Sequence, residues 1–187
     1  MSEIKPEFFE QDAIDVAPKL LGVQIYRKTQ SGYVKSGIIV ETEAYMQDDP
    51  ACHAFNGMTL RTRPMFEKGG ISYIYLIYGM YYCLNIVTGN KGCGQAVLIR
   101  ALEPLNGDNL SKIASGPGKL SRFLEINKND NGILFSKKNN IWFEKGIEVD
   151  KKQICFSERV GISKGKEFNW RFYIKDNPFV SKTKQKN

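Results

Sequence analysis

Two carboxylates interrupt an otherwise apolar stretch of the chain, residues 40–45, which reads VETEAY. A charged group among apolar side chains is costly unless it has a partner, so these acidic residues need a reason to be there. Glu43 could act as a general base that activates a water molecule. Arg100, facing inward on a neighbouring predicted strand, would keep that carboxylate ionised and hold it in place. The alternative is a structural ion pair or a solvated strand edge without chemistry.

The only histidine of the chain and several tyrosines accompany these carboxylates. His53 could donate a hydrogen bond to a flat ring or stack on it. Tyr45 and Tyr75 could enclose that ring, since stacking on a nucleobase contributes about 1–3 kcal/mol. Asn85 could bind the edge of the ring through its amide. Each residue also has an ordinary structural explanation: a packed histidine, tyrosines that fill a core, and an asparagine whose amide bonds to the backbone.

A tight turn separates two tyrosine-rich segments, residues 72–77 and 81–87, which read as a β-hairpin. Tyr78, Gly79 and Met80 form the predicted turn, where glycine can take a positive φ. A large aromatic side chain at a turn is exposed, and an exposed hairpin tip can enter a DNA groove as a wedge. The segment therefore predicts a wedge made of Tyr78 and Met80.

Basic residues gather at two further places. Arg61 and Arg63 form a basic loop suited to phosphate groups, and the alternative is a solvated surface. Residues 116–119, which read GPGK, open a predicted helix, where the backbone N–H groups near Gly116 and the Lys119 ammonium could bind a phosphate. Their spacing matches neither a P-loop nor a dinucleotide fingerprint. The net charge of +7 suits a polyanionic partner.

Length and composition bound the remaining possibilities. The 187 residues suit one domain, 1–187, and need no metal or disulfide to form a core. Four cysteines without a C-x-x-C pair indicate free thiols in a reducing cytosol and argue against a structural zinc site. Zinc deamination is also disfavoured, because the H-x-E and P-C-x-x-C signatures are absent. No apolar run reaches membrane-spanning length, so we expect a cytoplasmic protein that does not contact membranes.

The hydrophobic pattern predicts more strands than helices. Helices are expected at residues 12–21, capped by Asp12, and from residue 117. Strands are expected at residues 23–26, 36–45, 72–77, 81–87, 96–102, 141–143, 159–162 and 171–174. Alternation along the second strand points Glu41, Glu43 and Tyr45 the same way. We therefore expect an α+β fold, a mostly antiparallel curved β-sheet with flanking helices, a protruding hairpin and a loose Lys-rich tail from about residue 181.

Eight ordered blocks of the chain resemble the 3-methyladenine (alkylpurine) DNA glycosylases of the vertebrate alkyladenine type, in a short bacterial form. The blocks are residues 40–45, 65–66, 75–86, 98–104, 116–120, 126–127, 159–161 and 171–173. The resemblance extends from the first predicted helix to about residue 181. No single block is specific, but eight of them in order are.

The resemblance implies a role for each matching residue in water activation and base flipping. Glu43 matches the general base, and Arg100 and the backbone carbonyl of Val160 match the groups that hold the attacking water. Tyr78 matches the residue that fills the gap left by the flipped base. The base pocket is implied for a further set: Tyr45, Ala51, His53, Tyr75 and Asn85. Within it, Ala51 offers a backbone contact to the base, and Asn85 would clash with the exocyclic amine of guanine.

The implied enzyme is a monofunctional glycosylase that uses neither a metal nor an organic cofactor. Its partner is double-stranded DNA with a damaged purine, namely 3-methyladenine, with hypoxanthine and ethenoadenine left open. A monomer in the bacterial cytoplasm, associated with the nucleoid when on DNA, is expected. Two other functions stay open. A non-catalytic module that binds damaged nucleic acid would give Glu43 and Arg100 no task. A small-molecule hydrolase or transferase would leave an exposed Tyr78 unexplained.

Overall fold

The computed structural model describes residues 2–105 and 112–182 of the chain. Within them the helices are α1 (Ala13–Lys19) and α2 (Pro117–Phe123). The strands are β1 (Gln24–Lys28), β2 (Val34–Tyr45), β3 (Ser72–Ile77), β4 (Tyr81–Val87), β5 (Ala96–Pro104), β6 (Ile141–Glu144), β7 (Ile154–Ser157) and β8 (Arg171–Ile174). Short 3₁₀ turns occur at Pro6–Glu10, Arg63–Phe66, Lys128–Asp130, Lys137–Asn139 and Lys151–Gln153.

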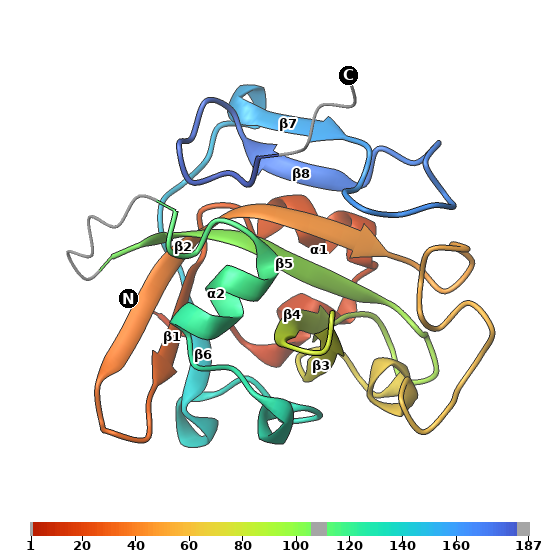
Figure 1. Ribbon diagram of the computed structural model, residues 1–187, viewed down its shortest axis with the longest axis horizontal. Helices are drawn as coiled ribbons and strands as arrows, with labels where there is room; N and C mark the ends of the chain where they lie inside the picture. The colour runs from red at the N-terminus through yellow and green to blue at the C-terminus, as the bar shows by residue number, and fades with distance from the viewer. Residues whose placement is uncertain (1, 106–111, 183–187) are drawn as a thin grey trace.

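The strands form one curved antiparallel sheet, so the expected α+β fold class is confirmed (Figure 1). Its main path runs β3-β4-β5-β2-β1-β6. Strand β8 also pairs with β2, and β7 pairs only with β8, so these two strands branch from β2 as a small two-stranded unit. Because β5 occupies one side of β2, strands β1 and β8 share the other side in succession.

Strand β2 is buried along most of its length and carries both carboxylates. The Thr42 hydroxyl donates a hydrogen bond to the Ala17 carbonyl at 2.9 Å, so this face of the strand packs on α1. Glu41 and Glu43 therefore point to the opposite face, as the alternation predicts. The register against β5 shifts on both sides of Glu41, and such a bulge bends a strand and redirects its side chains.

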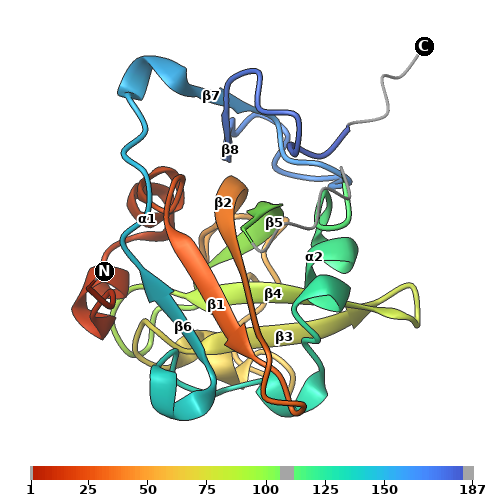
Figure 2. The ribbon, with the colours of Figure 1, turned by 90° about the vertical axis from the view of Figure 1, so that its left-hand side faces the viewer.

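The hairpin of β3 and β4 has the predicted bounds and extends away from the rest of the molecule (Figure 2). Tyr78 and Gly79 at its turn have φ values of 52° and 68°. The Met80 N–H closes the turn by donating to the Ile77 carbonyl at 3.2 Å. Two positive φ values in a row match the twist of a hairpin, although the residue that adopts the first is a tyrosine rather than the usual asparagine or glycine. Tyr78 is 87% exposed.

The first helix is shorter than expected. It spans Ala13–Lys19 with Pro18 inside it, and the chain turns away at Gly22, where φ is +87°. Asp12 stands at the N-cap, but its side chain does not cap the helix. Its Oδ1 instead accepts a hydrogen bond at 3.1 Å from Nε2 of Gln95, the residue immediately before β5.

One prediction for the C-terminal third is wrong. Residues 159–162 form a loop rather than a strand, since Gly161 has a φ of +80° and the Val160 N–H is donated to a side chain. The strand in this region is β7, Ile154–Ser157. The loose tail was expected from about residue 181, and Ser181 itself is buried and hydrogen-bonded. The predicted Lys-rich segment beyond residue 182, and part of the connection between β5 and α2, lie outside the described residues.

No helix in the described part of the chain is both long and apolar enough to cross a membrane. The four cysteines are free. Among residues 2–105 and 112–182, no group of three or more His, Cys, Asp or Glu side chains is placed to hold a metal ion.

Candidate active site

A cavity of about 480 Å³ opens between the β3–β4 hairpin, the C-terminal end of β2, the first half of β5, and two loops. One loop follows β2 and the other follows β7. Nine of the residues singled out from the sequence line this cavity: Glu43, Tyr45, Ala51, His53, Tyr75, Tyr78, Asn85, Arg100 and Val160. They come from segments that are far apart in the chain, and the curvature of the sheet brings them together.

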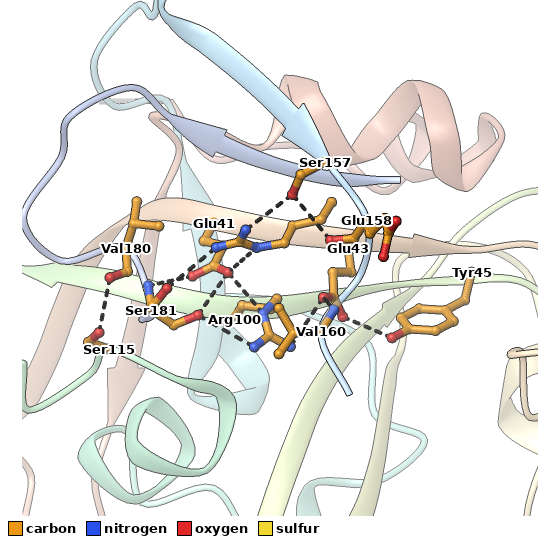
Figure 3. Close-up of polar contacts among 11 residues, drawn as sticks. Glu41, Glu43, Tyr45, Arg100, Ser115, Ser157, Glu158, Val160, Val180 and Ser181 are labelled. Carbon is orange, nitrogen blue, oxygen red and sulfur yellow. Dashed lines mark hydrogen bonds and ion pairs between the residues drawn. The ribbon is translucent and has the colours of Figure 1, made fainter. Parts of the chain in front are cut away.

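The Glu43 carboxylate is fully buried at the cavity wall and is held by three groups (Figure 3). The Val160 N–H donates to its Oε1 at 2.7 Å, and the Tyr45 hydroxyl donates to its Oε2 at 2.8 Å. Arg100 Nη1 lies 3.3 Å from the same Oε1. A carboxylate has about four acceptor positions, so both oxygens are oriented while some acceptor capacity remains for a water molecule.

Ionisable neighbours of Glu43 keep their protons. Burial raises the pKa of Tyr45 well above its usual value, and the Glu43 charge raises it further, so the phenol stays a donor. Burial acts to lower the pKa of Arg100, but the charges of Glu43 and Glu41 outweigh it and the net pKa is raised. The guanidinium therefore stays charged beside Glu43.

Three aromatic rings form another wall of the cavity. His53 Nδ1 lies 2.9 Å from the Tyr73 hydroxyl, and the His53 ring meets the Tyr75 ring edge-on, with centroids 4.6 Å apart. The Tyr73 and Tyr75 rings are 5.5 Å apart. Burial, followed by the neighbouring Cys83, raises the pKa of Tyr75, so its ring is a neutral phenol. A buried carboxylate facing a wall of electron-rich rings suits a flat, cationic ligand.

Comparison with known proteins agrees with this geometry. The family model described as methylpurine-DNA glycosylase (MPG) matches residues 7–178. The chain belongs to the methylpurine-DNA glycosylase family.

Curated relatives cover nearly the whole chain. A protein of Herpetosiphon aurantiacus is 42% identical over 100% of this chain and 92% of its own length, and one of Francisella tularensis subsp. tularensis is 45% identical over 90% and 93%. A third, from Carboxydothermus hydrogenoformans, is 42% identical over 94% and 97%. All three carry the name "Putative 3-methyladenine DNA glycosylase".

Some predicted site residues make contacts in the structure that the sequence did not predict. The Val160 N–H is donated to Glu43, and the expected role of its carbonyl in holding the water stays a prediction. Tyr45 was expected to stack on a ring, and its hydroxyl also holds Glu43. The Ala51 N–H is already donated to Asp49 Oδ1 at 2.9 Å. Asn85 both lines the cavity and bonds to the backbone, since its Nδ2 donates to the Tyr73 carbonyl at 2.9 Å.

The residues predicted to contact phosphates lie outside the cavity lining. Arg61 and Arg63 are exposed, and the Arg61 guanidinium lies over the Tyr75 ring, 5.5 Å from its centroid. Gly116 and Lys119 stand at the start of α2, next to the cavity-lining Pro117. Met80 is exposed at the hairpin tip but does not line the cavity. Their contacts with DNA stay predictions.

Two buried charged residues at the site have no role in the sequence-based prediction. Arg159 is fully buried with Asp49, its Nη2 3.0 Å from Asp49 Oδ1, and its Nη1 donates to the Ala44 carbonyl at 3.0 Å. This pair joins the loop that carries His53 to the loop that carries Val160. The Arg159 guanidinium also lies 4.7 Å from the Tyr45 ring centroid. The pair therefore fixes both loops at the cavity.

His53 should be neutral at physiological pH. Although much of its surface is accessible to solvent, the protein packed around the ring, followed by the Arg61 guanidinium, lowers its pKa from 6.5 to about 4. Because the folded-state pKa is the lower one, the ring favours folding at pH values above 6.5, and this contribution is lost as the pH falls towards 4.

This expectation is directly measurable, because the chain has a single histidine and gives one imidazole Hε1 signal in NMR. We expect the signal to titrate near pH 4. In Arg61→Gln the midpoint should rise, since a nearby positive charge is removed. Arg63→Gln is the matched control and should leave it unchanged. A midpoint at the ordinary value of 6.5 would contradict the described environment.

Proposed function

We propose that the chain is a monofunctional DNA glycosylase that removes 3-methyladenine from duplex DNA. The observation that carries this proposal is the Glu43 carboxylate, buried, oriented by three groups and facing a cavity walled by aromatic rings. The substrate class is supported by the names of the family and of the curated relatives. Hypoxanthine and ethenoadenine are further candidate lesions.

The proposed reaction starts with base flipping, because a base inside a duplex cannot reach a buried carboxylate. The extruded 3-methyladenine is cationic, and the faces of the Tyr75 and Tyr73 rings attract a cation. Its positive charge also makes it a good leaving group. Glu43 takes a proton from a water molecule, which attacks the sugar carbon as the glycosidic bond breaks. The products are the free base and an abasic site.

Hydrolysis by water leaves the DNA strand uncut. A lyase would instead need an amine that attacks the sugar carbon, and Lys164 is among the residues that line the cavity. Lys164 is exposed on a loop, whereas Glu43 lies buried and held by three donors, so the water route has the better-organised residue. Monofunctional chemistry is therefore part of the proposal.

Two substrates test the proposed function. Methylated DNA should release free 3-methyladenine, detected by chromatography. End-labelled duplexes with hypoxanthine or ethenoadenine rank the other lesions and should break only after alkali. Borohydride added during the reaction should trap no protein–DNA adduct. Salt-sensitive DNA binding without release of any base would support the non-catalytic binding module instead, and a borohydride adduct lost in Lys164→Gln would overturn the monofunctional route.

We propose that Tyr78 enters the duplex at the site of the flipped base, with Met80 beside it. Tyr78→Ala should lower single-turnover excision by roughly 5- to 150-fold, the equivalent of about 1–3 kcal/mol of lost stacking. Tyr33→Ala is a matched control, because Tyr33 is also an exposed tyrosine, at 75%, between β1 and β2 and outside the cavity lining. Equal rates for the two variants would contradict the wedge.

DNA binding is proposed to involve the phosphates around the flipped nucleotide. The proposed contacts are Arg61, Arg63, Lys119 and the backbone near Gly116. Arg61 lies over the cavity-lining Tyr75, and the others are within two residues of the cavity-lining Met65 or Pro117. The protein is proposed to act as a monomer on double-stranded DNA. The net charge of +7 favours association with a polyanion.

A further inference from the structure

Glu41 is fully buried and does not line the cavity, yet it is hydrogen-bonded to Arg100, which does. Its Oε1 accepts hydrogen bonds from Arg100 Nε at 2.9 Å, Arg171 Nε at 2.7 Å and Ser181 Oγ at 2.8 Å. Its Oε2 accepts one from the Ser181 N–H at 2.7 Å. Figure 3 shows this second carboxylate beside Glu43, with Arg100 shared between the two.

The orientation of Arg100 follows from these contacts. A guanidinium is planar and presents five N–H groups in a rigid fork, so fixing one edge fixes the rest. The Nε of Arg100 bonds to Glu41, and its Nη2 lies 3.4 Å from Ser181 Oγ. Nη1 is then the atom that reaches Glu43, at 3.3 Å. A free arginine would tend to pair with a carboxylate through two parallel hydrogen bonds.

We propose that Glu41 and Ser181 are positioning residues for Arg100, a role that rests on the function proposed for Glu43. By holding the Nε edge of the guanidinium, they restrict Arg100 to a single contact with Glu43. Without them Arg100 would turn to pair with both oxygens of Glu43 and occupy the acceptor positions that a water molecule needs. The two residues act through Arg100 and touch neither the cavity nor a base.

The C-terminal segment that carries Ser181 is itself anchored. Asn177 Nδ2 donates to Glu103 Oε2 at 2.9 Å, and the Ser115 hydroxyl donates to the Val180 carbonyl at 3.4 Å. Ser181, 140 positions from Glu41 in the chain, thereby completes the surroundings of Glu41 and Arg100. Ser115→Ala is the matched control, because the shorter Asn177–Glu103 hydrogen bond still holds the segment and the Ser115 hydroxyl does not touch Glu41.

The first test compares single-turnover excision rates and lesion-duplex Kd values. Glu41→Gln should lower the rate by about 10- to 100-fold, the order expected for a misplaced catalytic group, and should leave Kd nearly unchanged. Ser181→Ala keeps every charge, so it should fold normally and lower the rate by a few-fold, while Ser181→Thr restores it. Ser115→Ala should match the wild type. Rates unchanged in both Glu41→Gln and Ser181→Ala would overturn the proposal.

A double-mutant cycle separates positioning from a purely structural role. If Glu41 acts through Arg100, Glu41→Gln should cost little further activity in an Arg100→Gln protein. A structural role would instead lower the excision rate by the same factor in the wild-type and Arg100→Gln backgrounds, which would overturn the proposal.

A second readout does not depend on catalysis. The Arg100 Nε–H should exchange slowly with water in NMR of the wild type and of Ser115→Ala. It should exchange faster in Ser181→Ala, because its acceptor, Glu41 Oε1, loses the hydrogen bond from the Ser181 hydroxyl. Unchanged exchange in Ser181→Ala would overturn the positioning. The expected NMR pattern with no base release by the wild type would show that the function proposed for Glu43, and not the geometry around Arg100, has failed.

Discussion

Glu43→Gln is expected to abolish nearly all excision while leaving lesion binding intact. The loss should be about 100- to 10,000-fold in the single-turnover rate, the range associated with a general base. Glutamine has nearly the same shape and keeps an oxygen to accept the Val160 N–H, so the cavity should keep its form. It cannot take a proton from water, however, and the attacking nucleophile is then no longer activated.

The measurement is single-turnover base release with enzyme in excess, together with the Kd for a duplex that carries the lesion. Kd should stay within a few-fold of the wild type, because Glu43 acts in the transition state rather than in binding. Glu67→Gln is the matched control, since Glu67 is a glutamate paired with Lys91 and outside the cavity lining. A rate within tenfold of the wild type would remove Glu43 from the role of base.

Asp49→Ala is expected to lower the free energy of unfolding by about 3–5 kcal/mol, because it leaves the Arg159 guanidinium buried without its counter-charge. Both side chains of this pair are fully buried. Asp48→Ala is the matched control: Asp48 is the exposed neighbour, and such surface changes usually stay within about 0.5 kcal/mol.

Chemical denaturation followed by tyrosine and tryptophan fluorescence measures both variants. Adding Arg159→Met to Asp49→Ala should recover part of the loss, because the unpaired buried charge is then removed as well. A destabilisation below about 1 kcal/mol for Asp49→Ala would mean that water or another group compensates Arg159. In that case the pair would not be what fixes the two loops at the cavity.

Local patterns predicted the part of the site that comes from the sheet. Alternation along residues 36–45 placed Glu41, Glu43 and Tyr45 together, and all three are joined through Glu43 and Arg100 in the structure. The hairpin was predicted with its observed bounds, since a glycine between two tyrosine-rich strands is a strong short-range signal. These features depend on neighbours within a few residues.

Most of the site features that the sequence did not predict are long-range. The Asp49–Arg159 pair joins residues 110 positions apart, and Ser181 binds Glu41 across 140 positions. Residues 159–162 have an apolar pattern typical of a strand, but the buried Arg159 and the donation from Val160 to Glu43 hold them as a loop. Tyr73 was missed as a wall of the cavity, although its spacing of two from Tyr75 on one strand could have indicated it.

One structure would test the central claim most directly: the Glu43→Gln protein bound to a duplex that carries the lesion the wild type excises fastest. We expect the damaged nucleotide to be extruded, with its base against Tyr75 and His53 and Tyr78 in the gap. The sugar carbon should lie about 3–3.5 Å from a water molecule bound at residue 43. A lesion still stacked in the duplex, or a base held away from this cavity, would contradict the account.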